Sequence, residues 1–191
     1  MEMPHDQSGR KQQEDRQLQG RRPPPQGRRR GPQKIERFSG AGRLPSRGEP
    51  LPATSWVIRL LKISKDGKVK TTEFDFVLSS KDKQTDPPLL SVWEETLTPP
   101  KQALAIVSTT GEIYSGYCRL SVEAVRQIRC VGLPEHQLDV VWDPLEPMPP
   151  GGEGHAGVSG LERPTGAPKS AFKTLRVQLA DLAGRQLCHF S

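Results

Sequence analysis

The sequence lacks any run of apolar residues as long as the roughly 18 that a membrane-spanning helix requires. Its first residues lack the apolar core of a secretory signal peptide, and the acidic residues among them are not typical of a transit peptide. Cysteine is scarce: Cys118, Cys130 and Cys188 are too few and too widely spaced for a disulfide framework or a CxxC zinc site. We therefore expect a cytoplasmic protein with no membrane association, bound metal or cofactor.

Hydrophobic residues are also few, at 33% of the 191 residues, whereas the chain holds 19 prolines and 18 glycines. This composition is typical of a protein that is folded only in part. The charges divide the chain near Thr54: residues 1–53 hold 12 Lys or Arg and 6 Asp or Glu, and residues 54–191 hold 16 of each kind. We predict a disordered, basic, Gln/Arg/Pro-rich tail over residues 1–53 and one globular domain over residues 54–191.

The predicted tail carries the whole net positive charge of the chain. Arginine side chains contact nucleic-acid phosphates, and the tail has a pair and a triplet of them. It has neither RGG repeats nor the interleaved aromatic residues of sequence-tolerant single-strand binders. Two hypotheses remain for the tail. It is either a solvated extension or an electrostatic arm that binds nucleic acid through Arg21, Arg22, Arg28, Arg29 and Arg30.

The order of expected elements in the globular part predicts its fold class. Residues 55–63 and 69–79 read as two strands of a hairpin, joined by a turn at residues 65–68. Further strands are expected over residues 89–93, 112–119 and 138–142. Helices are expected over residues 98–107, capped by Thr98, over residues 121–128, capped by Ser121, and over residues 167–183. Long crossover helices do not regularly follow the strands, so we predict a small α+β domain with a C-terminal amphipathic helix.

The stretch from Pro149 to Leu161 is rich in glycine and is expected to be a loop. It contains His155, whose flanking glycines would let the ring approach a ligand, and Glu153, which could orient the ring or share a proton with it. The residues around Ser159 do not form the GxSxG pattern of a nucleophile elbow, and no second histidine stands at metal-ligand spacing. His155 and Glu153 are thus a candidate catalytic pair, and a histidine bonded to a loop carbonyl is the alternative.

Four segments together resemble small uncharacterised bacterial proteins. They are Arg59, the run from Phe76 to Ser79, the run from Leu90 to Val92, and the segment from Gly154 to Leu161, which reads GHAGVSGL. The resemblance covers residues 55–183, and the tail falls outside it. It implies no particular activity.

The order of Arg59, Ser91 and Glu112 also resembles the Arg–Ser–Glu order of ADP-ribosyltransferase toxins. The resemblance implies that the arginine holds the cofactor phosphate, that the serine braces the site, and that the glutamate activates the ribose. The chain departs from the pattern at Thr110, where the toxins have Glu or Gln, and it lacks the Ser-Thr-Ser sequence. Arg59, Ser91 and Glu112 form the alternative catalytic set.

No catalytic or metal-binding constellation stands out in the sequence, and the globular part is electrically neutral. Mixed surface charge suits protein contacts better than nucleic acid. We therefore expect a bacterial accessory or adaptor protein that binds another protein through its folded domain. The alternatives are a small enzyme or toxin of ADP-ribosyltransferase type, and nucleic-acid binding through the tail.

Overall fold

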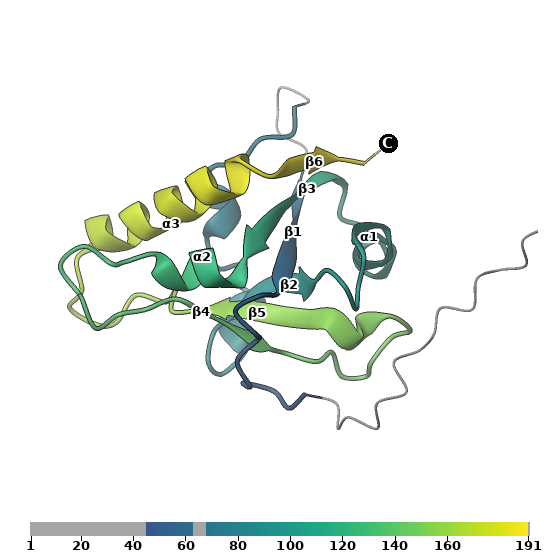
Figure 1. The fold of residues 1–191 in the computed structure, drawn as a ribbon, viewed down its shortest axis with the longest axis horizontal. Coiled ribbons are helices and arrows are strands. Elements are labelled where there is room, and N and C mark those ends of the chain that lie inside the picture. The colour runs from purple at the N-terminus through teal and green to yellow at the C-terminus, as the bar shows by residue number, and fades with distance from the viewer. Residues whose placement is uncertain (1–44, 63–67, 191) are drawn as a thin grey trace, which may run out of the picture. The chain divides into compact units, whose positions relative to one another are not determined.

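The computed structural model describes residues 45–62 and 68–190. Within these residues, six strands form one sheet in the order β4-β5-β2-β1-β3-β6, and every neighbouring pair is antiparallel (Figure 1). The strands are β1 (Trp56–Lys62), β2 (Leu90–Glu94), β3 (Tyr114–Ser121), β4 (Asp139–Trp142), β5 (His155–Ser159) and β6 (Leu187–His189). The sheet and its helices confirm the predicted α+β domain.

Helices cover both faces of the sheet. The α-helices are α1 (Pro100–Ser108), α2 (Val122–Gln127) and α3 (Lys169–Gly184), and the 3-10 helices are η1 (Glu73–Phe76), η2 (Asp82–Gln84) and η3 (Gly152–Gly154). Figure 1 shows α1 on the opposite side of the sheet from α2 and α3. Two hydrophobic clusters fill the layers. The larger contains Phe172, Leu175 and Leu179 of α3, and the smaller contains Ile58, Trp93 and Ala103 on the α1 side.

The glycine-rich stretch is not only a loop, because its second half is the strand β5, which pairs with both β4 and β2. Our sequence prediction was wrong here, since glycine has low strand propensity and conceals such a strand. The glycine at position 157 is required by close packing. A Cβ there would lie 2.5 Å from the Cβ of Leu89, well inside van der Waals contact. Glycine therefore allows a buried strand inside the sheet, between β4 and β2.

The expected hairpin is also wrong. The strand β1 pairs with β2 and β3, not with residues 69–79. The latter segment contains η1, where the Thr72 N–H and hydroxyl donate to the Asp75 carboxylate at 2.8 and 3.0 Å and close a short capped turn. The turn predicted at residues 65–68 lies, except for Lys68, outside the described residues. The apolar residues Phe76 and Leu78 of this segment are buried in the larger cluster instead.

Two predicted helix caps have different outcomes. Ser121 caps α2, since its hydroxyl accepts the Ala124 N–H at 3.4 Å. Thr98 does not cap α1. Its buried hydroxyl donates to the Gly151 carbonyl at 2.7 Å and accepts the Gly154 N–H at 3.0 Å. Thr98 therefore fastens the turn that precedes His155.

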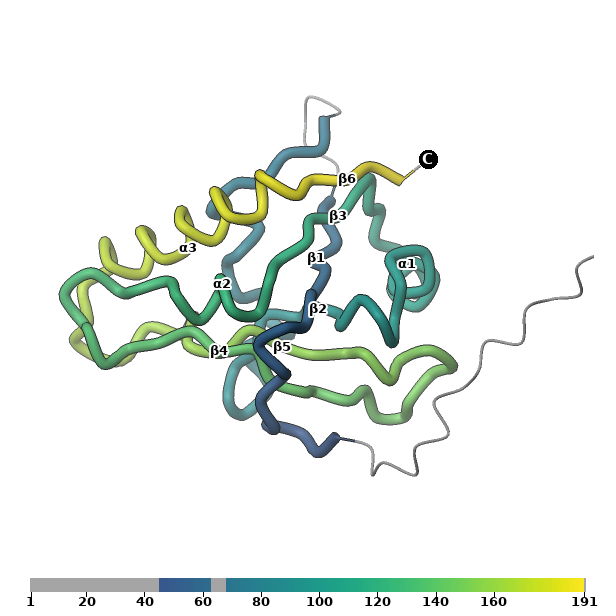
Figure 2. Tube along the Cα trace, in the orientation of Figure 1, coloured from purple at the N-terminus to yellow at the C-terminus, as the bar shows by residue number. Residues whose placement is uncertain are grey.

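The ordered structure includes residues that the charge division assigned to the tail. Residues 46–51, here called the strap, run along the outer edge of β4 (Figure 2). The Gly48 N–H donates to the Trp142 carbonyl at 2.8 Å, and the Leu51 N–H donates to the Val140 carbonyl at 2.9 Å. Leu51 is 1% exposed. The strap is thus an integral part of the domain.

Candidate functional site

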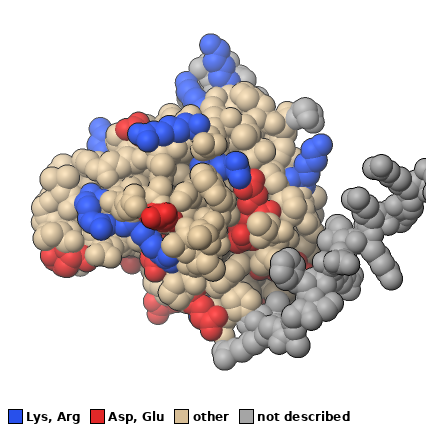
Figure 3. Space-filling view, in the orientation of Figure 1, with Lys and Arg blue, Asp and Glu red and all other residues tan. Residues whose placement is uncertain are grey.

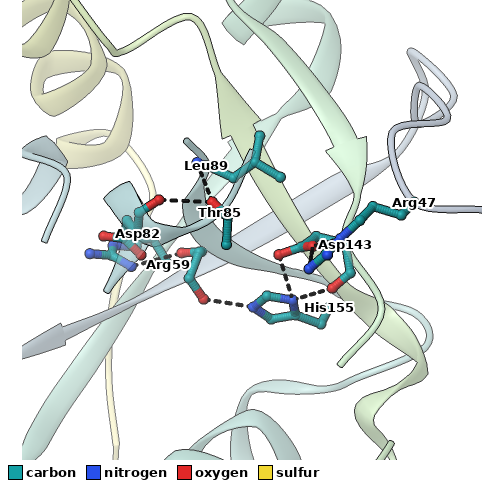
Figure 4. Close-up of polar contacts among 8 residues, drawn as sticks. Arg47, Arg59, Asp82, Thr85, Leu89, Asp143 and His155 are labelled. Carbon is teal, nitrogen blue, oxygen red and sulfur yellow. Dashed lines mark hydrogen bonds and ion pairs between the residues drawn. The ribbon is translucent and has the colours of Figure 1, made fainter. Parts of the chain in front are cut away.

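A row of polar groups crosses the sheet from β1 to the strap (Figure 4). It runs through Arg59 of β1, Ser91 of β2, His155 of β5, Asp143 directly after β4, and Arg47 of the strap. Neighbours in the row are joined by hydrogen bonds or ion pairs. The row brings together His155 from one predicted catalytic set and Arg59 and Ser91 from the other.

The strand register places Ser91 beside His155. Trp93 pairs with His155, and Ser91, two residues before Trp93, pairs with Gly157, so Ser91 and His155 are diagonal neighbours on the α1 face of the sheet. The Ser91 Oγ lies 2.9 Å from the His155 Nε2. The Trp93 ring meets the imidazole edge-on, with the ring centroids 4.8 Å apart. The Trp93 ring thus packs against the imidazole whose Nε2 faces the Ser91 hydroxyl.

The other imidazole nitrogen faces Asp143. The Nδ1 lies 2.5 Å from the Asp143 backbone oxygen and 3.5 Å from the Asp143 Oδ2. A carbonyl oxygen only accepts, so Nδ1 carries the proton and Nε2 presents its lone pair to the Ser91 hydroxyl. His155 is 7% exposed, and this burial lowers its pKa despite the opposing effects of the Asp143 carbonyl and carboxylate. The geometry and the burial both favour a neutral base.

Asp143 is held from the opposite side by the strap. Its carboxylate is 8% exposed and receives the Arg47 Nε and NH2, each 2.6 Å from Oδ1. Hydrogen bonds from the strap to β4 place Arg47 at this position. The arginine compensates a carboxylate that would otherwise be buried without a counter-charge. Oδ1 is thus used by Arg47, and Oδ2 is left to face the imidazole.

Arg59 reaches the row through the backbone. Its NH1 donates to the Ser91 carbonyl at 2.7 Å, and its NH2 lies 3.4 Å from the Asp75 carbonyl. The paired residues of β1 and β2 extend only from Val57 and Glu94 to Ile58 and Trp93. The guanidinium therefore spans the two strands beyond the end of their ladder.

The two predicted glutamates lie apart from the row. Glu112 accepts the Lys62 Nζ at 2.6 Å and a short hydrogen bond from the Tyr114 hydroxyl, and these bonds lower its pKa. Glu153 lies in η3, and both ring nitrogens of His155 are already bonded to Ser91 and Asp143. The arginines predicted to bind nucleic acid, at positions 21, 22, 28, 29 and 30, lie outside the described residues.

Sequence reasoning missed Asp143 and Arg47. Asp143 directly follows the strand expected over residues 138–142 and precedes Pro144, so its position indicates only the end of a strand. Arg47 lies in a segment assigned to the tail. Neither residue has a local sequence signal, because their meeting depends on the pairing of the strap with β4.

No family model matches the chain, and neither a curated protein nor a solved structure matches it. The function must be inferred from the site. In the part of the chain that the structure describes, no helix has the length and apolar character needed to cross a membrane. The same residues hold no group of three or more His, Cys, Asp or Glu side chains arranged to bind a metal ion.

Proposed function

We propose that the domain is a serine-dependent acyl-transfer enzyme, which cleaves an ester, thioester or amide. The observation that carries the proposal is the 2.9 Å contact between the Ser91 Oγ and the Nε2 of a buried histidine whose Nδ1 is bonded to Asp143. The order nucleophile, base and orienting residue is the one that activates serine in unrelated hydrolases. Here the main orienting contact comes from the Asp143 backbone carbonyl, and the Asp143 carboxylate lies farther from the same nitrogen, at 3.5 Å.

The groups present account for each proton transfer. His155 Nε2 removes the Ser91 proton as Oγ attacks the substrate carbonyl carbon, and the imidazolium so formed faces the Asp143 Oδ2 at 3.5 Å. His155 then donates that proton to the leaving group, and an acyl–Ser91 ester remains. Water loses a proton to the same nitrogen as it attacks this ester. The bond between the acyl carbon and the Ser91 Oγ then breaks, the acyl group leaves as a carboxylic acid, and Nε2 returns the proton to Oγ to regenerate the free serine.

The thiol nearest to the row does not compete as the nucleophile. Cys118 pairs with Arg59 in the sheet and is fully buried. Burial raises its pKa to about 12, so it remains a thiol at neutral pH, and the thiolate is the reactive form. Ser91, by contrast, is only partly buried.

A fluorophosphonate probe, which phosphonylates activated serines, tests the proposal without knowledge of the substrate. We expect one adduct, located on Ser91 by peptide mass spectrometry. Ser91→Ala removes it, and His155→Gln slows labelling by at least about 100-fold, the usual contribution of a general base. Ser159→Ala is the matched control, because Ser159 lies on β5 but bonds the Asp139 carbonyl. No adduct at Ser91, or wild-type labelling of His155→Gln, would refute the proposal.

A second proposal, protein binding by the domain as an accessory protein, is supported by an apolar surface on η1. Phe74 is 75% exposed, and Val77, which follows η1, is 41% exposed. Large exposed apolar side chains in one segment are typical of contact sites. A Phe74→Ser/Val77→Ser variant should lose partners captured from a source-cell lysate, whereas Ile113→Ser, at a separate residue that is 74% exposed, should keep them. Equal capture by both variants would exclude this surface.

The visible face of the domain carries side chains of both signs, and neither sign covers it (Figure 3). This distribution agrees with the balanced charge of residues 54–191. A mixed surface lacks the basic stripe by which folded domains bind nucleic acid. The tail arginines remain the chain's candidates for nucleic-acid binding, and removal of residues 1–44 should abolish any such binding in a salt-dependent gel-shift assay.

A further inference from the structure

The strand β6 is the outermost strand of the sheet, at the end opposite β4 (Figure 1). The strap covers the outer edge of β4 with backbone hydrogen bonds. Among the described residues, β3 is the only strand that pairs with β6, so the other side of β6 has no strand partner. An uncovered edge offers unpaired N–H and C=O groups to a further strand. The sheet therefore has one covered edge and one bare edge.

The ladder between β3 and β6 determines which backbone groups lie on the bare edge. The Phe190 N–H donates to the Ser115 carbonyl at 3.2 Å, so the backbone of residue 190 faces β3. Alternate residues of an antiparallel strand direct their backbone groups to opposite sides. The N–H and C=O groups of Leu187 and His189 therefore point away from β3. No hydrogen bond from a described residue reaches these groups.

The bare edge lacks the features that normally prevent a strand edge from pairing, which are proline, charged side chains and bulges. The run from Gln186 to Phe190 contains no proline and no Lys, Arg, Asp or Glu. The strand is also held firmly in place. The Phe190 ring packs against the Tyr117 ring of β3 with the centroids 5.3 Å apart, and Leu187 packs against the larger hydrophobic cluster. The outward groups are thus fixed in the geometry of a strand that can accept another.

We propose that β6 pairs antiparallel with β6 of a second copy of this chain, about a two-fold axis at Cys188. In this register Leu187 lies opposite His189 of the second copy, and the two residues exchange N–H to C=O hydrogen bonds. Every outward group of both copies is then paired. A register shifted by two residues would leave half of these groups unpaired within β6. The bare edge is thus complementary to itself, as a two-fold interface requires.

The same register brings the two Cys188 side chains together. They form a non-hydrogen-bonded pair, whose Cα atoms lie about 4.5 Å apart, and a disulfide spans about 4.4–6.8 Å between Cα atoms. Cys188 is half-buried, whereas Cys118 and Cys130 are buried. Oxidised glutathione can therefore link the two copies. One Cys188 thiolate attacks its disulfide and releases one glutathione, and the other Cys188 thiolate then displaces the second glutathione to form the Cys188–Cys188 bond.

The length of β6 sets the strength of the interface. Because β6 has only three residues, the ladder is short, and we expect a reversible dimer of the full-length protein under reducing conditions. Sedimentation velocity over about 10–500 µM protein measures its Kd.

His189→Pro tests the role of the outward backbone. It removes an N–H that points away from β3, so it leaves the ladder with β3 intact but deletes a hydrogen bond from each copy across the axis. We expect the Kd to rise at least about 10-fold. His189→Thr is the matched control, because it changes the side chain but keeps the N–H. Circular dichroism checks folding. If His189→Pro is unfolded, Cys188→Asp serves instead, since it sets two carboxylates opposite each other.

Oxidation identifies the register. With oxidised glutathione, the wild type should give a dimer on a non-reducing gel, and peptide mass spectrometry should find Cys188 linked to Cys188. Cys188→Ser should lose this covalent dimer but keep the reversible one, and the matched control Cys130→Ser should form both. A protein that remains monomeric up to about 500 µM would overturn the proposal. A dimer that is unchanged by His189→Pro, or one linked through a different pair of cysteines, would overturn it as well.

Discussion

The buried imidazole of His155 predicts a specific dependence of stability on pH. Desolvation is the main cause that lowers its pKa in the folded state. The Asp143 carbonyl and carboxylate oppose this effect, whereas the positive charges of Lys81 and Arg47 add to it. In the unfolded chain the imidazole returns to its ordinary pKa of about 6.5. Below that pH the unfolded chain binds a proton that the folded protein does not, so stability decreases as the pH falls.

The size of the effect has an upper limit. One proton bound only by the unfolded state changes the free energy of unfolding by about 1.4 kcal/mol per pH unit. For an unfolded pKa near 6.5, the loss between pH 7.5 and 5.5 is at most about 1.4 kcal/mol. Most carboxylates titrate below this window, so histidine dominates it. Above about pH 7.5 the imidazole is neutral in both states, so its ionisation no longer lowers the free energy of unfolding.

Urea unfolding at a series of pH values measures the loss, with tryptophan fluorescence as the signal, since Trp93 contacts the imidazole. His155→Gln is the informative variant, because its amide can both donate and accept but does not titrate. We expect the wild type to lose stability between pH 7.5 and 5.5, and the variant to lose less by up to about 1.4 kcal/mol. Identical pH dependence in the two proteins would show that His155 is not held neutral by burial.

Three further predictions concern other parts of the structure. Gly160→Ala should lower the free energy of unfolding by more than about 2 kcal/mol, because φ is +82° and the new Cβ would lie 2.5 Å from the Gln137 carbonyl oxygen. Gly166→Ala should lower it by only about 1–2 kcal/mol, because φ is +85° but the new Cβ would meet no other atom. Leu175→Ala should lower the unfolding free energy by about 2–5 kcal/mol, because α3 buries this side chain to 1% exposure; urea denaturation measures all three variants. Arg47→Gln should raise the pKa of His155, because it leaves the Asp143 carboxylate uncompensated beside the ring; titration of the imidazole by NMR checks this, and an unchanged pKa would contradict it.

Local patterns were sufficient to predict much of the fold. The spacing of apolar residues in α3 identified the helix that covers the larger cluster, and Ser121 identified the start of α2. Both signals act within one or two helical turns, so they survive in any tertiary context. The strand β5 could not be predicted in this way, because its glycine at position 157 is required by the approach of Leu89, a residue 68 positions earlier in the chain.

The candidate site was predicted only in pieces. His155, Ser91 and Arg59 were each selected from the sequence, but in two competing sets. Ser91 and His155 are 64 residues apart, and only the register of β2 and β5 makes them neighbours. No periodicity encodes such a register, and the GxSxG pattern is therefore a poor guide to a serine that lies within a strand.

The strap has a practical consequence for work on this domain. A fragment that begins at Thr54, where the charge balance changes, would lack the backbone partners of Val140 and Trp142 and the apolar side chain of Leu51. The outer edge of β4 would then present unpaired N–H and carbonyl groups, the surface by which sheets join edge to edge and aggregate. Poor solubility or inactivity of that fragment would be a consequence of the missing strap, which covers the edge of β4. Residues 45–53 therefore belong in every shortened form of the protein.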